Sequence, residues 1–229
     1  MIISHKHRFI FIKTEKTAGT SIEIALSKIC GPNDVITPIE PVDEEYRKEI
    51  GVRSCQNYRI PFSKWSFKDF LNSLKILRLP SFYNHMPAKK IKQYVTEDQW
   101  NDYYKFTFER NPFDKLISYY FWTNTNNDYS SIQEFIDSGK AKGIAGYDLY
   151  TINDEIVVDK VYNYENLKEA MLDISSKLKL DEELKLPQRK AKGHVRKNRD
   201  HYSKVLNNDQ IEWVKKEFFK EIDLFNYAT

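Results

Sequence analysis

An unbroken run of four apolar residues, 9–12, is the first clear pattern in the chain. A run of β-formers without polar alternation is typical of a strand buried on both faces of a parallel sheet. Polar residues follow over 13–21, and Ile22 and Leu26 then recur at helical spacing. The pattern therefore predicts a strand, a loop and a helix that begins near Gly19.

The same order of elements recurs around residue 110. Residues 103–108 predict a second buried strand. Asn111 caps a helix well and Pro112 suits its first turn, so we expect a helix directly after this strand. Arg110 then stands at the carboxyl end of a strand, the edge at which open α/β sheets bind ligands. Ser118, two turns into the helix, lies off its apolar stripe and faces polar surroundings.

The rest of the pattern fits a single domain over residues 1–229. Residues 31–62 have few periodic apolar positions, so we interpret them as irregular with one short strand, either a wall of the acceptor site or a surface insertion. Residues 65–79 predict an amphipathic helix, which we interpret as packed on the core. A hairpin is expected over 150–158, then a strand that leads into a helix near Leu167. This order predicts a P-loop-like α/β fold of three layers, in which a central, mostly parallel sheet is flanked by helices.

Composition narrows the class of protein. The 229 residues are 41% hydrophobic and 30% charged, which is typical of a globular domain. A net charge of +3 excludes a strongly polybasic protein, and two cysteines exclude a disulfide framework. No apolar run has the length of a membrane span, and only about eight residues precede the first strand, too few for a secretion signal. We therefore expect a soluble, cytoplasmic protein, and the sequence contains no metal-ligand cluster.

The polar loop over 13–21 carries two lysines, one glycine and four hydroxyl side chains. Unsatisfied amides and the dipole at the start of the next helix favour an anion, which we expect to be a phosphate or sulfate ester. A plain capped turn is the alternative, but it would need only one hydroxyl and no lysine. The Walker pattern of nucleotide kinases fails, because Lys16 comes three residues before Gly19 instead of directly before the final hydroxyl.

The loop resembles the 5′-phosphosulfate loop of sulfotransferases that use 3′-phosphoadenosine 5′-phosphosulfate (PAPS), particularly the carbohydrate sulfotransferases with a PKTAGTS-type loop. The residues that the resemblance assigns to donor binding are Lys16, Thr17, Ala18, Gly19, Thr20 and Ser21. The resemblance also implies that Lys16 neutralises the leaving oxygens. Glu15 stands where this loop usually has proline, so a carboxylate lies beside the anion site.

A second set of residues resembles the family's 3′-phosphate signature, RxPxxRxxSxY. It consists of Arg110, Pro112, Lys115, Ser118 and Tyr120, with lysine in place of the second arginine. The resemblance implies that Arg110 and Ser118 bind the 3′-phosphate that sets PAPS apart from ATP. Two signatures in the right order, each at a strand-to-helix junction, are more specific than either alone.

His85 is the candidate catalytic base. It lies in a loop just before Pro87, and a His-x-Pro-Ala step between the two signatures recurs in the carbohydrate sulfotransferases. A histidine also suits the removal of a proton from an attacking hydroxyl. The alternatives are a solvated loop histidine without a catalytic function, and Glu15 as a substitute base.

Two further regions have open interpretations. Tyr164 starts a "YExL" step like the one that places an aromatic ring near the adenine in this family, but it could equally be a core tyrosine. Residues 185–204 carry eight Lys or Arg and one acidic residue. They could form a solvated loop or a lid over PAPS; a nucleic-acid patch would need a binding motif that they lack. For the lid, the candidate contacts to the 3′-phosphate are Lys192, Gly193 and Arg196.

The sequence thus predicts a sulfotransferase that moves the sulfuryl group of PAPS to an acceptor hydroxyl by in-line displacement, with a saccharide as the expected acceptor. Two alternatives stay open. One is a P-loop kinase that uses ATP and Mg²⁺, and the other is a non-enzymatic protein that binds polyanions through residues 185–204.

Overall fold

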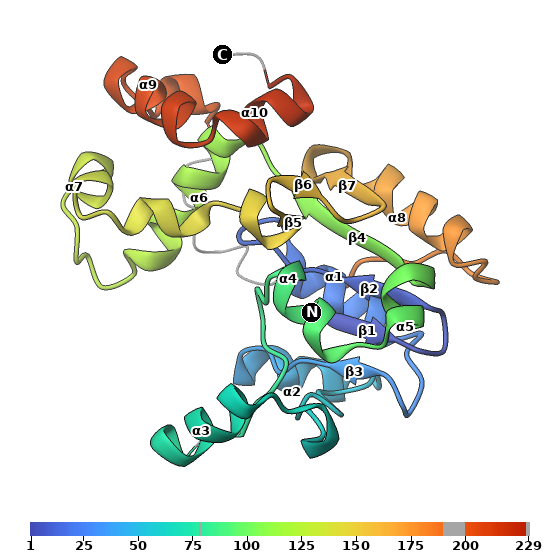
Figure 1. Ribbon diagram of the computed structural model, residues 1–229. Coiled ribbons are helices and arrows are strands. Elements are labelled where there is room, and N and C mark those ends of the chain that lie inside the picture. Colours follow the sequence, from blue (N-terminus) through green and yellow to red (C-terminus); the bar gives the residue numbers. More distant parts are fainter. Residues whose placement is uncertain (78, 190–199, 228–229) are drawn as a thin grey trace.

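The structure is a computed structural model that describes residues 1–77, 79–189 and 200–227 (Figure 1). At its centre is a five-stranded sheet with the order β3-β1-β2-β4-β7. Its strands are β1 (Ile2–Ser4), β2 (Phe9–Phe11), β3 (Val35–Ile36), β4 (Tyr104–Glu109) and β7 (Lys160–Asn163). Strands β2, β4 and β7 pair in parallel, and β1 alone runs antiparallel to its neighbours β2 and β3. The predicted mostly parallel sheet is therefore confirmed.

Helices cover both faces of this sheet, as a three-layer fold requires. The described helices are α1 (Gly19–Ser27), α2 (Pro41–Glu49), α3 (Phe67–Ile76), α4 (Ala88–Tyr94), α5 (Glu97–Asp102), α6 (Pro112–Thr123), α7 (Ile132–Asp137), α8 (Leu167–Lys177), α9 (Asn208–Glu217) and α10 (Phe219–Phe225). Apolar residues of α1 and α8 pack with Phe11 and Phe106 on one face. Residues of α4 and α5 pack with Ile10 and Ile12 on the other face. A third cluster joins α6, α7 and α9.

The register of the parallel strands positions the site. Phe11 pairs with Phe106, and the N–H of Ile12 donates to the carbonyl of Phe106 at 3.0 Å. The two strands therefore end at the same edge, and the loops that follow them emerge side by side. Each loop leads into a helix, α1 after β2 and α6 after β4, as the sequence predicts. The predicted hairpin is also present, as β5 (Thr151–Ile152) and β6 (Glu155–Ile156).

Residues 31–62 contain the short strand that was predicted, β3, but they are less irregular than predicted because they also contain α2. Helix α2 has signals at its ends: Pro41 is at its first position, acidic residues occupy its first turn and basic residues its last. It has no apolar stripe for the periodicity to detect. Its buried contact is made instead by Arg47, which is fully buried.

Residues 65–79 were predicted to form a helix and to pack on the core, and the second of these predictions is wrong. The helix exists as α3, but its apolar residues face outward, with Phe67 77%, Leu74 62% and Leu77 92% exposed. Figure 1 shows α3 at the periphery, away from the sheet. The periodicity correctly predicts an apolar face, but it does not reveal what that face contacts.

Candidate active site

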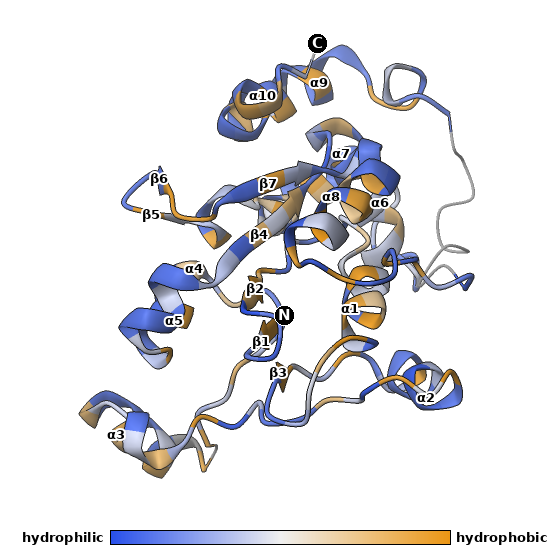
Figure 2. Ribbon diagram, turned by 90° about the vertical axis from the view of Figure 1, so that its right-hand side faces the viewer, coloured by the Kyte–Doolittle hydropathy of each residue, from blue (hydrophilic) through white to orange (hydrophobic). Residues whose placement is uncertain are grey.

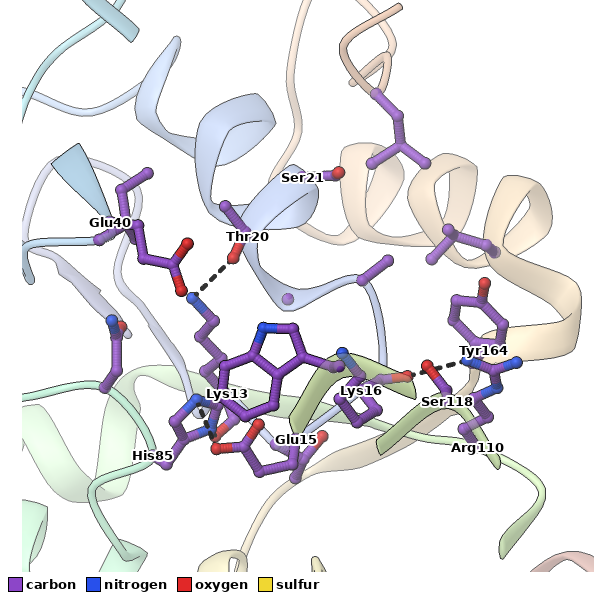
Figure 3. Close-up of a pocket in the computed structure, with 18 of the residues that line it drawn as sticks. Lys13, Glu15, Lys16, Thr20, Ser21, Glu40, His85, Arg110, Ser118 and Tyr164 are labelled. Atoms are coloured by element: carbon purple, nitrogen blue, oxygen red, sulfur yellow. Dashed lines mark hydrogen bonds and ion pairs between the residues drawn. The ribbon is translucent and has the colours of Figure 1, made fainter. Parts of the chain in front are cut away.

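A cavity of about 740 Å³ lies where the loops after β2 and β4 meet (Figure 3). This size is within the range of small-molecule sites. Both predicted signatures line it, since Lys16 and Ser21 come from the first loop and helix, and Arg110 and Ser118 from the second. His85 lines the same cavity although it lies far from both in the sequence.

The start of α1 forms an anion cradle. Ala18 is the N-cap in the left-handed conformation with φ 59°, and its side chain offers no capping bond. The first helical bond runs from the N–H of Ile22 to the carbonyl of Ala18 at 3.1 Å. The amides of the first turn, at Gly19, Thr20 and Ser21, therefore lack partners within the helix and favour an anion beside them.

Two threonines hold the loop in shape, and of the two only Thr14 lines the cavity. The hydroxyl of Thr14 donates to the carbonyl of Phe108, and its oxygen lies 3.0 Å from the hydroxyl of Thr17. Thr17 is fully buried and can also donate to the carbonyl of Thr14 at 3.2 Å. The expected contact of the Thr17 hydroxyl with the donor is therefore not available, because that hydroxyl is used inside the loop.

Lys13 is a site residue that the sequence analysis does not single out. Its Nζ lies 2.5 Å from Glu23 Oε2 and 3.2 Å from Thr20 Oγ1, and both Lys13 and Glu23 are buried. The Lys13 stem also crosses Gly19, where an added Cβ would lie 2.7 Å from Lys13 Cγ. Lys13 and Glu23 are ten residues apart, on a strand end and a helix, so only the fold pairs them.

Lys16 follows in a strained part of the loop, with a left-handed φ of 58°. Its ammonium lies 4.9 Å from the centre of the Trp122 ring, a cation–π contact at the cavity wall. Trp122 is another residue that the sequence analysis missed. It lies four residues after Ser118 on α6, so the helical spacing that places Ser118 at the site could also have placed Trp122 there.

Arg110 lies beside Lys16 on the same side of the cavity (Figure 3). Its guanidinium is 4.5 Å from the Tyr164 ring centre, and one of its terminal nitrogens donates to the carbonyl of Lys16 at 3.3 Å. Its Nε is buried and has no hydrogen-bond partner among the described residues. A buried donor without an acceptor is costly, so this guanidinium is poised for an anionic ligand. Tyr164 also lines the cavity.

Lys115 does not take the part of the signature's second arginine. Its side chain is 2% exposed, and its Nζ lies 2.5 Å from Oε1 of the fully buried Glu109. Burial raises the pKa of Glu109, and the Lys115 ammonium opposes that rise. Lys115 thus neutralises a core carboxylate beneath the site and does not line the cavity.

His85 and Glu15 contact each other in the lining of the cavity. His85 Nε2 lies 3.1 Å from Glu15 Oε1, and His85 Nδ1 lies 3.1 Å from the carbonyl oxygen of Lys13. Because a carbonyl only accepts, Nδ1 carries a proton, and Nε2 is the nitrogen that can take up a second one and then donate it to Glu15. Burial, assisted by the Lys13 ammonium, lowers the pKa of His85 to about 3, so the imidazole is neutral near pH 7.

The lid candidates Lys192, Gly193 and Arg196 lie outside the described residues. The segment just before them does reach the site, because Leu186, Pro187 and Gln188 line the cavity.

Comparison with known proteins agrees with this geometry. The model of the sulfotransferase family matches residues 1–228, so the chain belongs to the sulfotransferase family, whose members use PAPS as the sulfuryl donor. The mouse sulfotransferase SULT7A1, solved in complex with PAP, matches 98% of this chain and 87% of its own at a TM-score of 0.52 and 14% identity, which supports the fold. An uncharacterized protein of Archaeoglobus fulgidus is 31% identical over 126 residues, which are 53% of this chain and all of that protein.

The predicted family, donor and type of enzyme are thereby confirmed. Among the described residues, no helix is both long and apolar enough to cross a membrane.

Proposed function

We propose that this sulfotransferase transfers the sulfuryl group to a carbohydrate hydroxyl, with His85 as the catalytic base. The observation that carries the proposal is the joint placement of Lys16, Arg110 and His85 around one cavity. Two cationic positions suit a donor with two anionic ends, and the buried Nε of Arg110 requires an acceptor. The described residues therefore fit PAPS.

In this proposal the two ends of the donor have separate binding groups. The amides of Gly19 and Thr20 and the hydroxyls of Thr20 and Ser21 bind the 5′ end. Arg110 and Ser118 bind the 3′-phosphate, and Tyr164 lies beside the adenine. When bound, PAPS supplies an activated sulfuryl group whose bond to the phosphate oxygen breaks as the new bond to the acceptor oxygen forms. Lys16 stabilises the negative charge on the departing oxygen.

His85 accepts the proton of the acceptor hydroxyl at Nε2. The Lys13 carbonyl fixes the tautomer that leaves this nitrogen basic, and the Glu15 carboxylate stabilises the imidazolium that results. The low pKa of His85 reflects burial and the nearby Lys13 ammonium. A negatively charged donor in the cavity offsets that ammonium, so we expect the pKa of His85 to rise when the donor binds.

The carbohydrate acceptor rests on the resemblance of the loop to the carbohydrate-type sulfotransferases. The Trp122 ring at the cavity wall supports it, since a flat aromatic surface suits the apolar face of a sugar ring. We further propose a cytoplasmic setting, with which the two free cysteines, Cys30 and Cys55, agree.

The test is a thermal-unfolding titration with 3′,5′-adenosine diphosphate, the product of transfer, against ATP with Mg²⁺. Ligand at about 100 times its Kd should add about 2.7 kcal/mol, or about 5–10 °C for a chain of this size. Arg110→Ala should reduce the shift at the same ligand concentration by about half or more. The matched control Arg8→Ala, at a surface pair with Asp102, should keep it.

A shift with ATP and Mg²⁺ alone would contradict the donor site and favour the kinase alternative. If the bisphosphate shift is found, labelled PAPS with a panel of saccharides then tests the acceptor. Activity on non-carbohydrate alcohols only would contradict the acceptor and leave the donor site intact.

A further inference from the structure

Exposed apolar side chains gather on α3 and the segment around it. Within the described residues, seven of the thirteen large apolar residues that are exposed fall between positions 62 and 79. Six of them form what we call the apolar patch: Phe62, Phe67, Phe70, Leu71, Leu74 and Leu77. Spacings of three and four place the four that lie within α3 on one face of the helix, and Leu77 follows as its C-cap. Contiguous exposed apolar surface marks an interaction site.

The patch is held outward by bonds, so its exposure is built into the fold. Residues 58–60 and 80–82 run antiparallel as two legs, with Ile60 N–H donating to Pro80 O at 3.0 Å and Phe82 N–H to Tyr58 O at 2.7 Å. Helix α3 belongs to the segment of chain that connects the two legs, and it begins with a capping box of Ser66 and Asp69. Tyr94 of α4 donates to Asp69 at 2.9 Å and ties the polar side of α3 to the body.

Positive charge accompanies the apolar surface. Residues 59–79 carry five Lys or Arg and one acidic residue, whereas the whole chain has a net charge of only +3. The single acid is Asp69, which is used in the capping box and by Tyr94. Lys68 and Lys75 are exposed on α3 itself. Figure 2 shows α3 as a projecting element with hydrophobic and hydrophilic positions interleaved.

We propose that the apolar patch docks this protein onto an anionic lipid bilayer. A helix with large apolar residues on one face and lysines beside them lies in the membrane interface, where anionic headgroups attract its charges. A symmetric dimer through the same patch would oppose two positively charged segments, and nucleic acid would leave the apolar residues without a partner. The return leg continues to Asn84 and His85 at the cavity, so a short stretch of chain joins the docking segment to the cavity wall.

The experiment is co-sedimentation of the whole chain with phosphatidylcholine vesicles that contain or lack 30 mol% phosphatidylglycerol, without donor or acceptor. The reading is therefore independent of the proposed function. We expect binding only to the anionic vesicles, and weaker binding as the salt concentration rises. Each lysine near the surface should contribute about fivefold, so Lys68→Gln with Lys75→Gln should weaken partitioning by about 30-fold.

The apolar part is tested with Phe67→Glu and Leu74→Glu combined, which should abolish sedimentation. Phe219→Glu, at a residue 55% exposed on α10, is the matched apolar control, and Lys168→Gln with Lys177→Gln on α8 is the matched charge control. Both controls should bind like the wild type. Unchanged thermal midpoints verify that every variant is folded.

Equal binding to neutral vesicles, or binding that the α3 variants leave unchanged, would overturn the proposal. A concentration-dependent dimer in sedimentation equilibrium that Leu74→Glu dissociates, without vesicle binding, would overturn it in favour of a contact between copies of the chain. Retention on an oligonucleotide column that the lysine variants abolish, without vesicle binding, would overturn it in favour of nucleic acid.

Discussion

At the residue scale, four cationic side chains near the site have different functions because each one has different neighbours. Lys16 and Arg110 line the cavity, Lys13 is paired with Glu23 beside it, and Lys115 neutralises Glu109 beneath it. The sequence marks all four as basic residues near a signature. It cannot tell them apart, because the partners Glu23 and Glu109 are identified only by side-chain placement.

Substitution of Lys16 and substitution of Arg110 should therefore change different constants, the first kcat and the second the Kd of the bisphosphate. Lys16→Ala removes a group that acts on charge developing in the transition state, so kcat should fall by about 10²–10³ with little change in bisphosphate affinity. Arg110→Ala removes a charged hydrogen bond to the bound donor, worth about 1.5–3 kcal/mol, so Kd should rise by about 10–150-fold. Steady-state kinetics and calorimetric titration measure both. Wild-type constants in either variant would refute its role.

Lys115→Met should affect stability and not donor affinity. It leaves the buried Glu109 carboxylate uncompensated, which costs about 3–5 kcal/mol and should lower the thermal midpoint by about 6–20 °C. Glu109→Gln in the same chain removes the stranded charge and should restore much of the loss. A normal thermal midpoint combined with weakened bisphosphate binding would instead indicate that Lys115 binds the 3′-phosphate, as the signature implies.

At the element scale, the two strand-loop-helix units were predictable because their signals are local. Buried strands appear as apolar runs, and Asn111 with Pro112 announces the start of α6. Helix α2 escaped prediction because a buried arginine, not an apolar stripe, anchors it. For α3 the periodicity gave the helix but could not show that its apolar face meets solvent. The pairing of His85 with Glu15 depends on the distant loop that delivers His85.

Adjacent small residues in the loop before α1 should respond oppositely to substitution. Ala18 is left-handed, so Ala18→Gly relieves strain at that residue and should leave stability unchanged or raise it by up to about 1 kcal/mol. Gly19→Ala places a Cβ against the Lys13 stem, which must move, and should lower kcat. Denaturant unfolding and turnover of both variants check this. Full activity in Gly19→Ala would show that the position of Lys13 is not critical.

At the scale of the whole molecule, the buried site ties stability to pH. His85 has a folded-state pKa of about 3, while the unfolded chain takes up that proton near pH 6.5. The unfolded state therefore binds more protons between these values, and the free energy of unfolding falls as the pH drops below about 6.5. His5 and His7, whose pKa values are also lowered by burial, act in the same direction.

The share of His85 can be isolated by comparing wild type with His85→Gln between pH 7 and pH 4.5. One proton contributes a slope of at most about 1.4 kcal/mol per pH unit, and the variant should lack it. The Glu23 carboxylate, with its pKa lowered to about 2, also begins to lower stability below about pH 5, where the unfolded carboxylate takes up a proton, but it does so in both proteins and cancels in the comparison. Parallel slopes in the two proteins would mean that the folded state does not hold His85 neutral.

The prediction of a single domain over 1–229 stays a prediction.

The paired legs at 58–60 and 80–82 make this part of the chain a detachable module. Because Ile60 and Pro80 are already hydrogen-bonded neighbours, a short glycine-containing turn could join them and delete everything between. The shortened protein should still bind the bisphosphate, since Asn84 and His85 keep their anchor, but should no longer sediment with vesicles. Membrane docking would then depend on the segment between the two legs, and donor binding on the rest of the chain. Either property could be gained or lost without the other.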